Sequence, residues 1–182
     1  NLGVAHVPED RQRMGIISDF SASESALLGY QNDKEINQGV WLKRSSVKAN
    51  CESIMEAFDV RPTNPDLKSS NFSGGNQQKL ILAREFERDP EVLIIGQPTR
   101  GIDIGAIEFI RKRIIKMRDA GKAIILISVE LEEIMSISDR IIVMCDGEIT
   151  GTVDAAKADE ATLGMMMANA LPSDNKITEA QL

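Results

Sequence analysis

The sequence predicts a layered α/β fold in which parallel strands alternate with helices. Two short, continuously apolar runs, EVLIIG (91–96) and KAIILIS (122–128), have the length and composition of buried strands. The segment between them, 105–121, has apolar residues at three- and four-residue steps and closes at a glycine, as an amphipathic helix does. Strand, helix and strand in this order indicate a parallel sheet covered by helices.

The predicted first strand, 4–7, is followed by a stretch of different character. Residues 11–72 are polar and are broken by Asn, Ser, Gly and Pro. Within this stretch, 45–60 carries an apolar stripe at helical spacing, with Ser45-Ser46 as candidate N-caps. A second, shorter helix is predicted over 21–30. We therefore expect a mostly helical lobe between the first strand and the rest of the core.

The remaining elements complete an α/β core. Helices are predicted from apolar spacing, and a hairpin from an Asp-Gly pair between two strand-like runs. These elements are a helix over 76–89, a helix over 130–138, a hairpin over 140–153 with its turn at Asp146-Gly147, and a helix over 159–170. We expect one partial domain over 1–170, with a core of 1–10 and 73–170, a helical subdomain over 11–72, and a flexible tail over 171–182.

Composition limits the kind of partner that the chain can take. The 182 residues carry a formal net charge of -7 and a pI near 4.9, and no Lys/Arg block occurs. Proteins that follow a phosphate backbone are usually basic or carry a basic stripe, so we expect no nucleic-acid partner. Two cysteines, Cys51 and Cys145, are too few for a disulfide scaffold and predict free thiols in a reducing compartment. No apolar run approaches the roughly 20 residues that cross a bilayer.

The most informative stretch is NFSGGNQQK at 71–79. Ser73 can cap the helix that follows, and Gly74 and Gly75 leave its first turn without side chains. Helix N-termini expose unpaired N–H groups and a partial positive charge, which attract anions, and glycines there let a phosphate approach closely. A loop with a serine cap and no ligand explains the same residues, so the surrounding motifs decide between the two interpretations.

The order of motifs around this turn resembles that of ATP-binding cassette (ABC) ATPases. Phe72-Ser73-Gly74-Gly75-Asn76, followed by Gln77, is similar to the LSGGQ signature motif. LIIGQPTRGID (93–103) resembles a Walker B strand followed by the D-loop, which ends at Asp103. ISVELEEI (127–134) resembles the switch-histidine segment, and VAHVPED (4–10) resembles the strand that enters the Q-loop, with Glu9 at the usual glutamine position. The resemblance covers about residues 1–170 and implies a P-loop NTPase-like core with a helical subdomain.

Two stretches narrow the resemblance further. SGGNQQK and QPTRGIDIGA are similar to the ATP-binding subunits of bacterial importers for simple sugars and nucleosides, in which two cassettes share one chain. The chain is most similar to the second cassette of the nucleoside type. This implies membrane permease subunits, a partner cassette and, indirectly, a solute-binding protein as partners, at the cytoplasmic face of the inner membrane. Permease docking is expected on the helical lobe, at 16–30.

The Walker A motif of that family is absent from the sequence. It needs Gly, four residues, Gly-Lys and then Ser or Thr, whereas the only Gly-Lys pair, Gly121-Lys122, is followed by Ala123. The resemblance places the Walker A strand and helix before the Q-loop, and the chain begins at Asn1, almost at the first strand. We therefore expect a piece of a longer polypeptide that lacks both elements. ATP and Mg²⁺ are expected for the full-length protein, and neither for the soluble piece, which we expect to be inactive alone.

Other positions of the family's catalytic site are altered. Gly96 and Gln97 stand where the family has the Walker B Asp, which holds Mg²⁺, and the Glu that orients the attacking water. Gln97 can hydrogen-bond a water but cannot take its proton. Val129 occupies the switch-histidine position, and Glu9 places an anion near the γ-phosphate and the metal. Only the Gly96 and Glu9 positions bear on the metal, so no intact metal site is expected and the Walker site is degenerate.

The glycine turn, by contrast, keeps the family pattern. In the family, each nucleotide lies between the Walker A motif of one cassette and the signature turn of the other. The resemblance implies that Ser73 and the Gly75 N–H contact the γ-phosphate of ATP held by the partner, with Asn76 and Gln77 in the same motif and Asp103 acting across the seam. The full-length protein is then a transport-coupled ATPase. Alternatives are a non-transport ABC module, as in DNA repair or translation, and a regulatory dimerisation domain.

Three further features are interpreted as packing or surface residues. His6, the single histidine, lies inside the first predicted strand and is taken as a packed or edge residue. The run at 165–167, three methionines, is taken as packing against a core. Arg100 fits an ion pair across a dimer seam and an ordinary surface arginine equally well.

Overall fold

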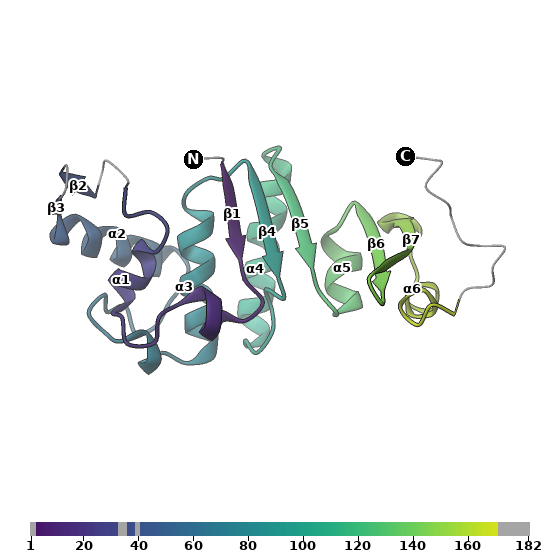
Figure 1. Ribbon diagram of the computed structural model, residues 1–182, viewed down its shortest axis with the longest axis horizontal. Coiled ribbons are helices and arrows are strands. Elements are labelled where there is room, and N and C mark those ends of the chain that lie inside the picture. The colour runs from purple at the N-terminus through teal and green to yellow at the C-terminus, as the bar shows by residue number, and fades with distance from the viewer. Residues whose placement is uncertain (1–2, 33–35, 39–40, 171–182) are drawn as a thin grey trace. The chain divides into compact units, whose positions relative to one another are not determined.

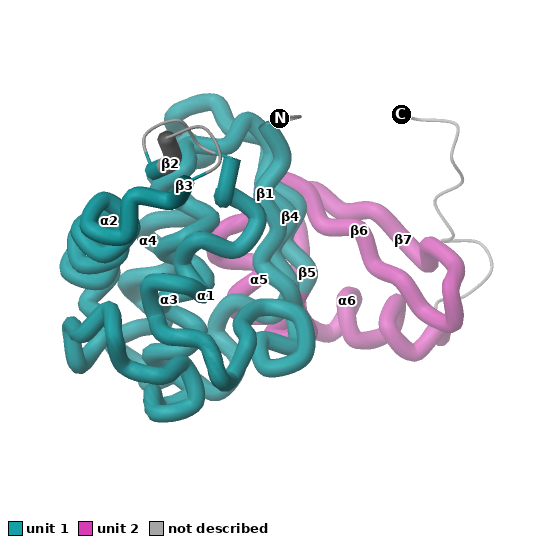
Figure 2. The backbone as a smooth tube through the Cα atoms, turned by 60° about the vertical axis from the view of Figure 1, so that its left-hand side comes forward, with its two compact units in different colours: residues 1–127 teal, residues 128–182 magenta. Residues whose placement is uncertain are grey.

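The computed structural model describes residues 3–32, 36–38 and 41–170. The chain forms two compact units, residues 1–127 and residues 128–182 (Figure 2). The predicted tail over 171–182 lies outside the described residues. No helix among the described residues is both long and apolar enough to cross a membrane.

Three parallel strands form the sheet of the first unit. They are β1 (Val4–Val7), β4 (Val92–Gly96) and β5 (Ala123–Ile127), in the order β1-β4-β5 with β4 in the centre (Figure 1). The register places His6 beside Ile94 and Ile94 beside Ile125. The predicted parallel sheet is confirmed, since β1 pairs parallel with β4 and β4 pairs parallel with β5. The connections between these strands contain helices, as parallel strands require.

One face of this sheet is buried and the other is open. Ala5, Val7, Leu93 and Ile95 are buried, whereas alternate residues on β1 and β5 are exposed. The prediction that 122–128 is a buried strand is therefore wrong with respect to burial. The physical reason is that β5 pairs only with β4 among the described residues, so one of its edges has no paired strand, and Ile125 and Ile127 on one face are more than half exposed.

Two helices contribute much of the buried apolar surface of the first unit. The first, α3 (Gly74–Phe86), packs against β1 and buries most of its length, including Leu80, Ile81 and Leu82. The second, α4 (Ile104–Asp119), buries Ala106, Ile110 and Ile114, which recur every four residues on one helical face. It ends before Gly121, whose φ of +86° is the left-handed conformation that glycine favours after a helix.

The segment between β1 and α3 is mostly helical, as predicted. It contains a π-turn, η1 (Arg11–Gly15), two α-helices, α1 (Ala22–Leu27) and α2 (Arg44–Ala57), and a 3₁₀ turn, η2 (Ser69–Asn71). Ser21 and Glu24 form a capping box at the start of α1. Two short antiparallel strands that the sequence did not suggest, β2 (Asn37–Gln38) and β3 (Trp41–Leu42), lie between the helices.

The N-cap of α2 differs from the prediction. The cap position is Lys43, which makes no side-chain hydrogen bond to the helix, and Ser45-Ser46 lie inside the first turn. The helix begins earlier than its apolar stripe does, because the stripe marks only the buried face. Cys51, Ile54 and Met55 form that face.

The second unit is built on the predicted hairpin. Its strands are β6 (Arg140–Cys145) and β7 (Glu148–Asp154), and the turn residues Asp146 and Gly147 both have positive φ. Helices α5 (Leu131–Ile137) and α6 (Glu160–Met167) and the turn η3 (Ala155–Lys157) complete it. Its core comprises Ile141, Val143, Leu163 and Met166. Of the methionine run, only Met166 is buried, so the predicted packing role holds for that residue alone.

Candidate functional site

Three segments of the first unit converge beyond the carboxyl ends of β1 and β4. They are the loop after β1 with Glu9 and Arg11, the turn after β4 up to Asp103, and the first turn of α3. The backbone N of Glu9 would lie 3.0 Å from a Cβ placed on Gly96, and Asp103 Oδ2 would lie 4.0 Å from a Cβ placed on Gly75. In open α/β sheets, ligands bind beyond this end of the strands.

Ser73 starts α3 and orders its first turn. Its hydroxyl oxygen accepts from the Asn76 backbone N–H at 3.4 Å and from Asn76 Nδ2 at 3.0 Å. Asn76 Oδ1 in turn accepts from the Arg61 backbone N–H at 2.8 Å, which ties the turn to the helical lobe. Because Ser73 Oγ acts as an acceptor in both bonds, its own proton is available for a further acceptor.

Gly74 and Gly75 are the first two residues of α3, and their surroundings differ. A Cβ on Gly74 would meet Arg11 Nη2 at 2.5 Å, which no real side chain tolerates without a shift. A Cβ on Gly75 would meet Ile102 Cγ2 at 3.7 Å, an ordinary contact. An added side chain would therefore displace the Arg11 guanidinium at the first glycine and would make an ordinary contact at the second.

Gln77, the last residue of the predicted motif, faces inward. It is buried, and its Nε2 donates to the Ser69 carbonyl oxygen at 2.9 Å. Its Oε1 has no hydrogen-bond partner among the described residues. In this arrangement Gln77 braces the start of α3 against η2, while Ser73, Gly74, Gly75 and Asn76 form the outer surface of the turn.

The turn after β4 holds Gln97 in an unusual backbone conformation. Its φ is +47°, its N–H donates to the Ile127 carbonyl oxygen at 2.8 Å, and its side chain is buried. Further on, Asp103 is the N-cap of α4, and its Oδ1 accepts from the Ala106 N–H at 2.9 Å. Both residues are thus fixed by hydrogen bonds to the sheet or to the following helix.

An arginine of the same turn pairs with Glu9. Arg100 Nη1 lies 2.9 Å from Glu9 Oε1, and both side chains are more than half exposed. This places the partner of Arg100 within its own chain. The carboxylate that was expected near a metal is therefore engaged by a cation. Among the described residues, no group of three or more His, Cys, Asp and Glu side chains could hold a metal ion.

Curated relatives resemble the chain over most of its length. It is 44% identical over 164 residues to the nucleoside import ATP-binding protein NupA of Lactococcus lactis. The aligned residues cover 90% of this chain and 32% of that protein. It is 43% identical to the guanosine import ATP-binding protein NupO of Bacillus subtilis, covering 91% of this chain and 32% of the relative. The ribose import ATP-binding protein RbsA of Clostridium perfringens is 37% identical over 90% of this chain. The chain spans about a third of the length of these relatives.

Solved structures agree with the architecture. The dimeric structure of MJ0796, a bacterial ABC transporter cassette, has a TM-score of 0.67 at 21% identity, covering 83% of this chain and 62% of that one. The fold is that of an ATP-binding cassette. No family model matches the sequence.

Within this cassette fold, Val129 belongs to the second unit. It lies between β5 and α5 and is 63% exposed. The neighbouring Ser128 hydroxyl accepts from the Glu130 N–H at 3.1 Å, which shapes the bend. The other predicted site residues lie in the first unit, so the structure brings Glu9, the glycine turn and the 96–103 segment together but does not place Val129 relative to them.

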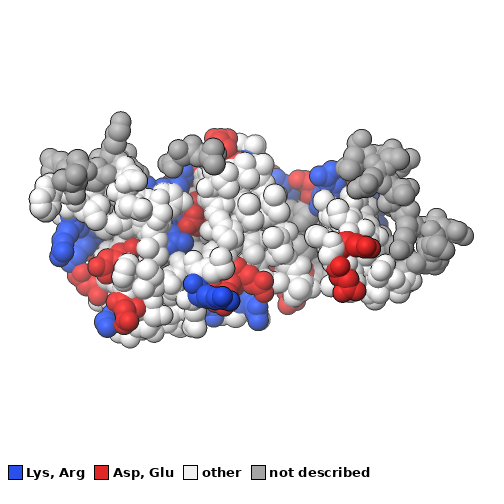
Figure 3. Space-filling model, viewed as in Figure 1, with Lys and Arg blue, Asp and Glu red and all other residues white. Residues whose placement is uncertain are grey.

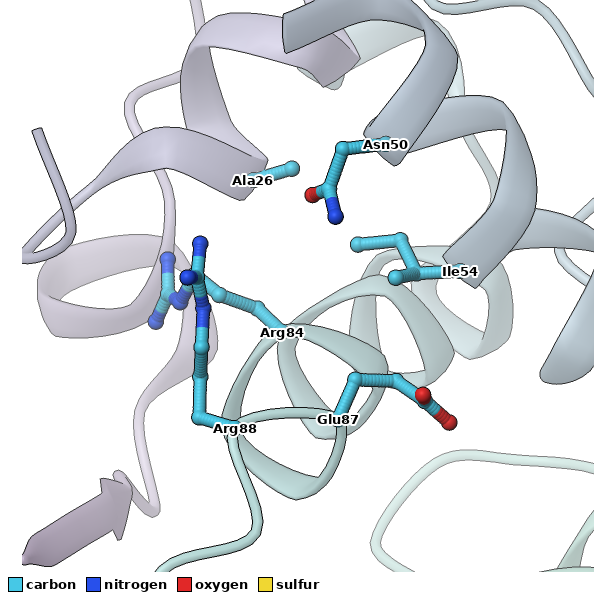
Figure 4. Close-up of a pocket in the computed structure, with 6 residues that line it drawn as sticks. All are labelled: Ala26, Asn50, Ile54, Arg84, Glu87 and Arg88. Atoms are coloured by element: carbon cyan, nitrogen blue, oxygen red, sulfur yellow. The ribbon is translucent and has the colours of Figure 1, made fainter. Parts of the chain in front are cut away.

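A cavity of the cassette lies away from this convergence. It measures about 100 Å³ and lies between α1 and α2 of the helical lobe and the C-terminal end of α3 (Figure 4). Its lining residues are Ala26, Asn50, Ile54, Arg84, Glu87 and Arg88. The buried Arg84 donates to Glu85 and to the carbonyl oxygens of Gly15 and Ser25. These bonds join α3 to the helical lobe, so the cavity is a packing feature and the convergent loops are the candidate site.

The residue that sequence reasoning missed at this site is Arg11. Its Nη1 donates to the Arg100 carbonyl oxygen at 3.0 Å, across 89 positions of sequence. Only its place in the run Glu9-Asp10-Arg11, directly after a strand, could have drawn attention to it.

Proposed function

We propose that this chain is part of the ATP-binding subunit of a bacterial ABC importer for nucleosides or simple sugars. The printed functions of its relatives, which import nucleosides, guanosine and ribose, support this assignment. In this proposal the subunit is a longer polypeptide that includes this piece, which the coverage of about a third of those relatives supports. Its partners are membrane permease subunits, a partner cassette and, indirectly, a solute-binding protein, at the cytoplasmic face of the inner membrane.

The observation that carries the proposal is the turn at 73–75. It begins a 13-residue helix with a serine cap and two glycines. In this proposal the Ser73 hydroxyl and the Gly75 N–H donate to the γ-phosphate of ATP that the partner cassette holds. The positive end of the helix dipole favours the phosphate there, and the bare backbone admits it at hydrogen-bond distance. Asp103, which caps α4 behind Gly75, orders the same surface at the seam between cassettes.

The cassette's own Walker site has lost the groups that Mg²⁺ and water activation need. Gly96 has no ligand atom, Gln97 is a buried amide with a strained backbone, and Glu9 is paired with Arg100. The residues present therefore fit a phosphate supplied from outside and do not fit a bound Mg²⁺. We infer that ATP and Mg²⁺ are held in full by the partner cassette, and that this chain alone turns over no ATP.

The domain assignment follows the same proposal. Residues 1–10 and 73–170 form the core of a partial cassette, and 11–72 form the lobe that docks on the permease. Ile17 and Phe20, which are 42% and 38% exposed, offer an apolar contact within the expected docking stretch at 16–30.

A bulky substitution tests the proposal. Ser73→Arg in the complete subunit, assembled with its permease, should abolish solute uptake, because the side chain occupies the place of the phosphate. The matched control is Ser70→Arg, an exposed serine three positions earlier, which should leave uptake unchanged. Uptake into vesicles and circular dichroism of the purified variants separate loss of function from loss of fold. Undiminished uptake with Ser73→Arg would refute the proposal.

A further inference from the structure

Arg11 joins the three segments of the candidate site. Its Nη1 donates to the Arg100 carbonyl oxygen, and its Nη1 and Nη2 would both lie 3.5 Å from a Cβ on Gly101. On the other side, its Nη2 and Cζ would lie 2.5 and 3.2 Å from a Cβ on Gly74. The guanidinium is thus inserted between two glycines, one at the start of α3 and one in the turn after β4.

A second link runs in parallel. The side chain of Arg100 pairs with Glu9, while its carbonyl oxygen accepts from Arg11. Glu9 and Arg11, both after β1, therefore bind the side chain and the backbone carbonyl of Arg100, respectively. Because Gly74 lies against the Arg11 guanidinium, the position of the glycine turn depends on the loop after β1 and on the turn after β4.

Stability alone does not explain this placement. A cation beside the first turn of a helix is unfavourable, since that end carries partial positive charge. Arg11 Nε is also buried and has no hydrogen-bond partner among the described residues, which costs further free energy. Features that are costly to the fold and lie at a site are typical of functional positioning.

We propose that Arg11 is a positioning residue that sets the glycine turn for its phosphate contact. This inference rests on the proposed function. It assigns a separate role to Gly74, whose missing side chain makes room for the Arg11 guanidinium, while Gly75 presents its N–H to the phosphate. Displacing the guanidinium moves the turn, and a displacement of about 1 Å at a reacting group can lower the rate by as much as 100-fold.

The first test is the steady-state kinetics of the complete subunit in its transporter. Arg11→Ala should lower kcat for ATP at least tenfold and change KM for ATP less than twofold, because the turn engages only when the cassettes close. Arg11→Lys should not restore kcat, since an ammonium cannot fill the planar space between two glycines. Arg13→Ala, which removes an exposed arginine of the same turn, is the matched control and should keep wild-type kcat.

The second test is a double-mutant cycle. Gly74→Ala expels the guanidinium, so it should lower kcat about as much as Arg11→Ala does, and the double variant should be no worse than either single one. Effects that multiply instead would mean that the two residues act independently, which would overturn the proposal.

Hydrogen exchange on the 182-residue chain separates this inference from the proposed function. Without nucleotide, the amides of 74–77 should exchange faster in Arg11→Ala than in the wild type or in Arg13→Ala. If Ser73→Arg abolishes uptake while Arg11→Ala keeps wild-type kcat and exchange, the positioning role is refuted and the proposed function stands. If Ser73→Arg leaves uptake intact while exchange in Arg11→Ala increases, the proposed function fails and the contact of Arg11 with the turn stands.

Discussion

At the scale of single residues, Gly96 is the position where the chemistry of the site and the packing of the sheet meet. It ends β4, and the loop after β1 passes so close that a Cβ would lie 3.0 Å from the Glu9 N and 3.3 Å from the Glu9 Cβ. The nearest group is backbone, which cannot rotate away as a flexible side chain can. An aspartate at this position would need the Glu9 loop to move.

We therefore expect Gly96→Ala to destabilise the chain by about 1 kcal/mol, through overpacking against the Glu9 backbone. The control is Gly105→Ala in the first turn of α4, where the added Cβ would meet Asp103 Oδ1 at an ordinary 3.5 Å. That change should stabilise the chain by roughly 0.5 kcal/mol, because alanine is the better helix former. Urea unfolding of the three proteins measures both values, and equal midpoints for the two variants would contradict the argument.

The sequence indicated some of these residues and not others, for a physical reason. Ser73 could be predicted as a cap because capping depends on residues three positions away, and Asp103 was indicated only by the order of motifs. Arg11 could not, because its contacts lie 63 positions or more along the chain and depend on how β1, β4 and α3 pack. The partner of Arg100 remained open for the same reason, since Glu9 approaches it only through the register of β1 and β4.

At the scale of elements, a buried ionic network holds α1 against α3. Arg84 Nε lies 2.7 Å from Glu85 Oε1, and both side chains are only 7% exposed. Arg84 also donates to the carbonyl oxygens of Gly15 and Ser25, and Tyr30 donates to Glu85 at 2.6 Å. The lobe is therefore joined to α3 by charge-assisted hydrogen bonds in addition to apolar packing.

Removing the cation of this network, Arg84, should strongly lower the free energy of unfolding. Arg84→Met leaves the Glu85 carboxylate buried without its counter-ion and removes one donor from each of two carbonyl oxygens, so we expect a loss of about 3–5 kcal/mol in the free energy of unfolding. Lys112→Met breaks an exposed pair with Glu108 on α4 and should not change stability measurably. Denaturant unfolding compares them, and a small effect of Arg84→Met would show that the network is not what joins the helices.

The same network makes stability depend on alkaline pH. Burial and the hydrogen bond to Glu85 raise the pKa of Tyr30 above its usual value of about 10. The fold thus favours the protonated phenol, so this contribution is complete below about pH 10 and is lost as pH rises through the higher folded pKa.

Because Tyr30 is the single tyrosine, tyrosinate absorbance reports it directly. The native chain should titrate at higher pH than the urea-unfolded chain. Between neutral and alkaline pH, the free energy of unfolding should fall less for Tyr30→Phe than for the wild type. Identical titrations of the folded and unfolded chains would contradict this interpretation.

The type and order of the elements followed from apolar periodicity, whereas their surroundings did not. Periodicity predicted α4, which has one buried face, and the Asp146-Gly147 pair predicted the turn of the hairpin. The apolar pattern failed to predict the exposure of β5. A continuous apolar run is typical of a buried strand, but it does not report which elements pack against that strand. It also missed β2 and β3, which are too short for a pattern.

At the scale of the whole molecule, the open face of the β1-β4-β5 sheet is the most unusual feature. All-parallel sheets are normally covered on both faces. Here Val4, Ile125 and Ile127 are about half exposed, and the surface over these strands in Figure 3 is largely free of charged side chains. Within the part of the chain that the structure describes, β5 pairs only with β4, so its other edge presents backbone groups that can pair with another strand.

We therefore expect the 182-residue chain to self-associate as its concentration rises, through this face and edge. Ile125→Lys should shift the association to higher concentration with little change in stability, because the side chain is 54% exposed in the folded chain. Met14→Lys replaces an apolar residue of the π-turn that is 67% exposed, away from the sheet, and is the control. Light scattering across a concentration series measures the mass of each protein. A wild type that stays monomeric throughout, or an equal effect of the two lysines, would show that the open sheet does not drive association.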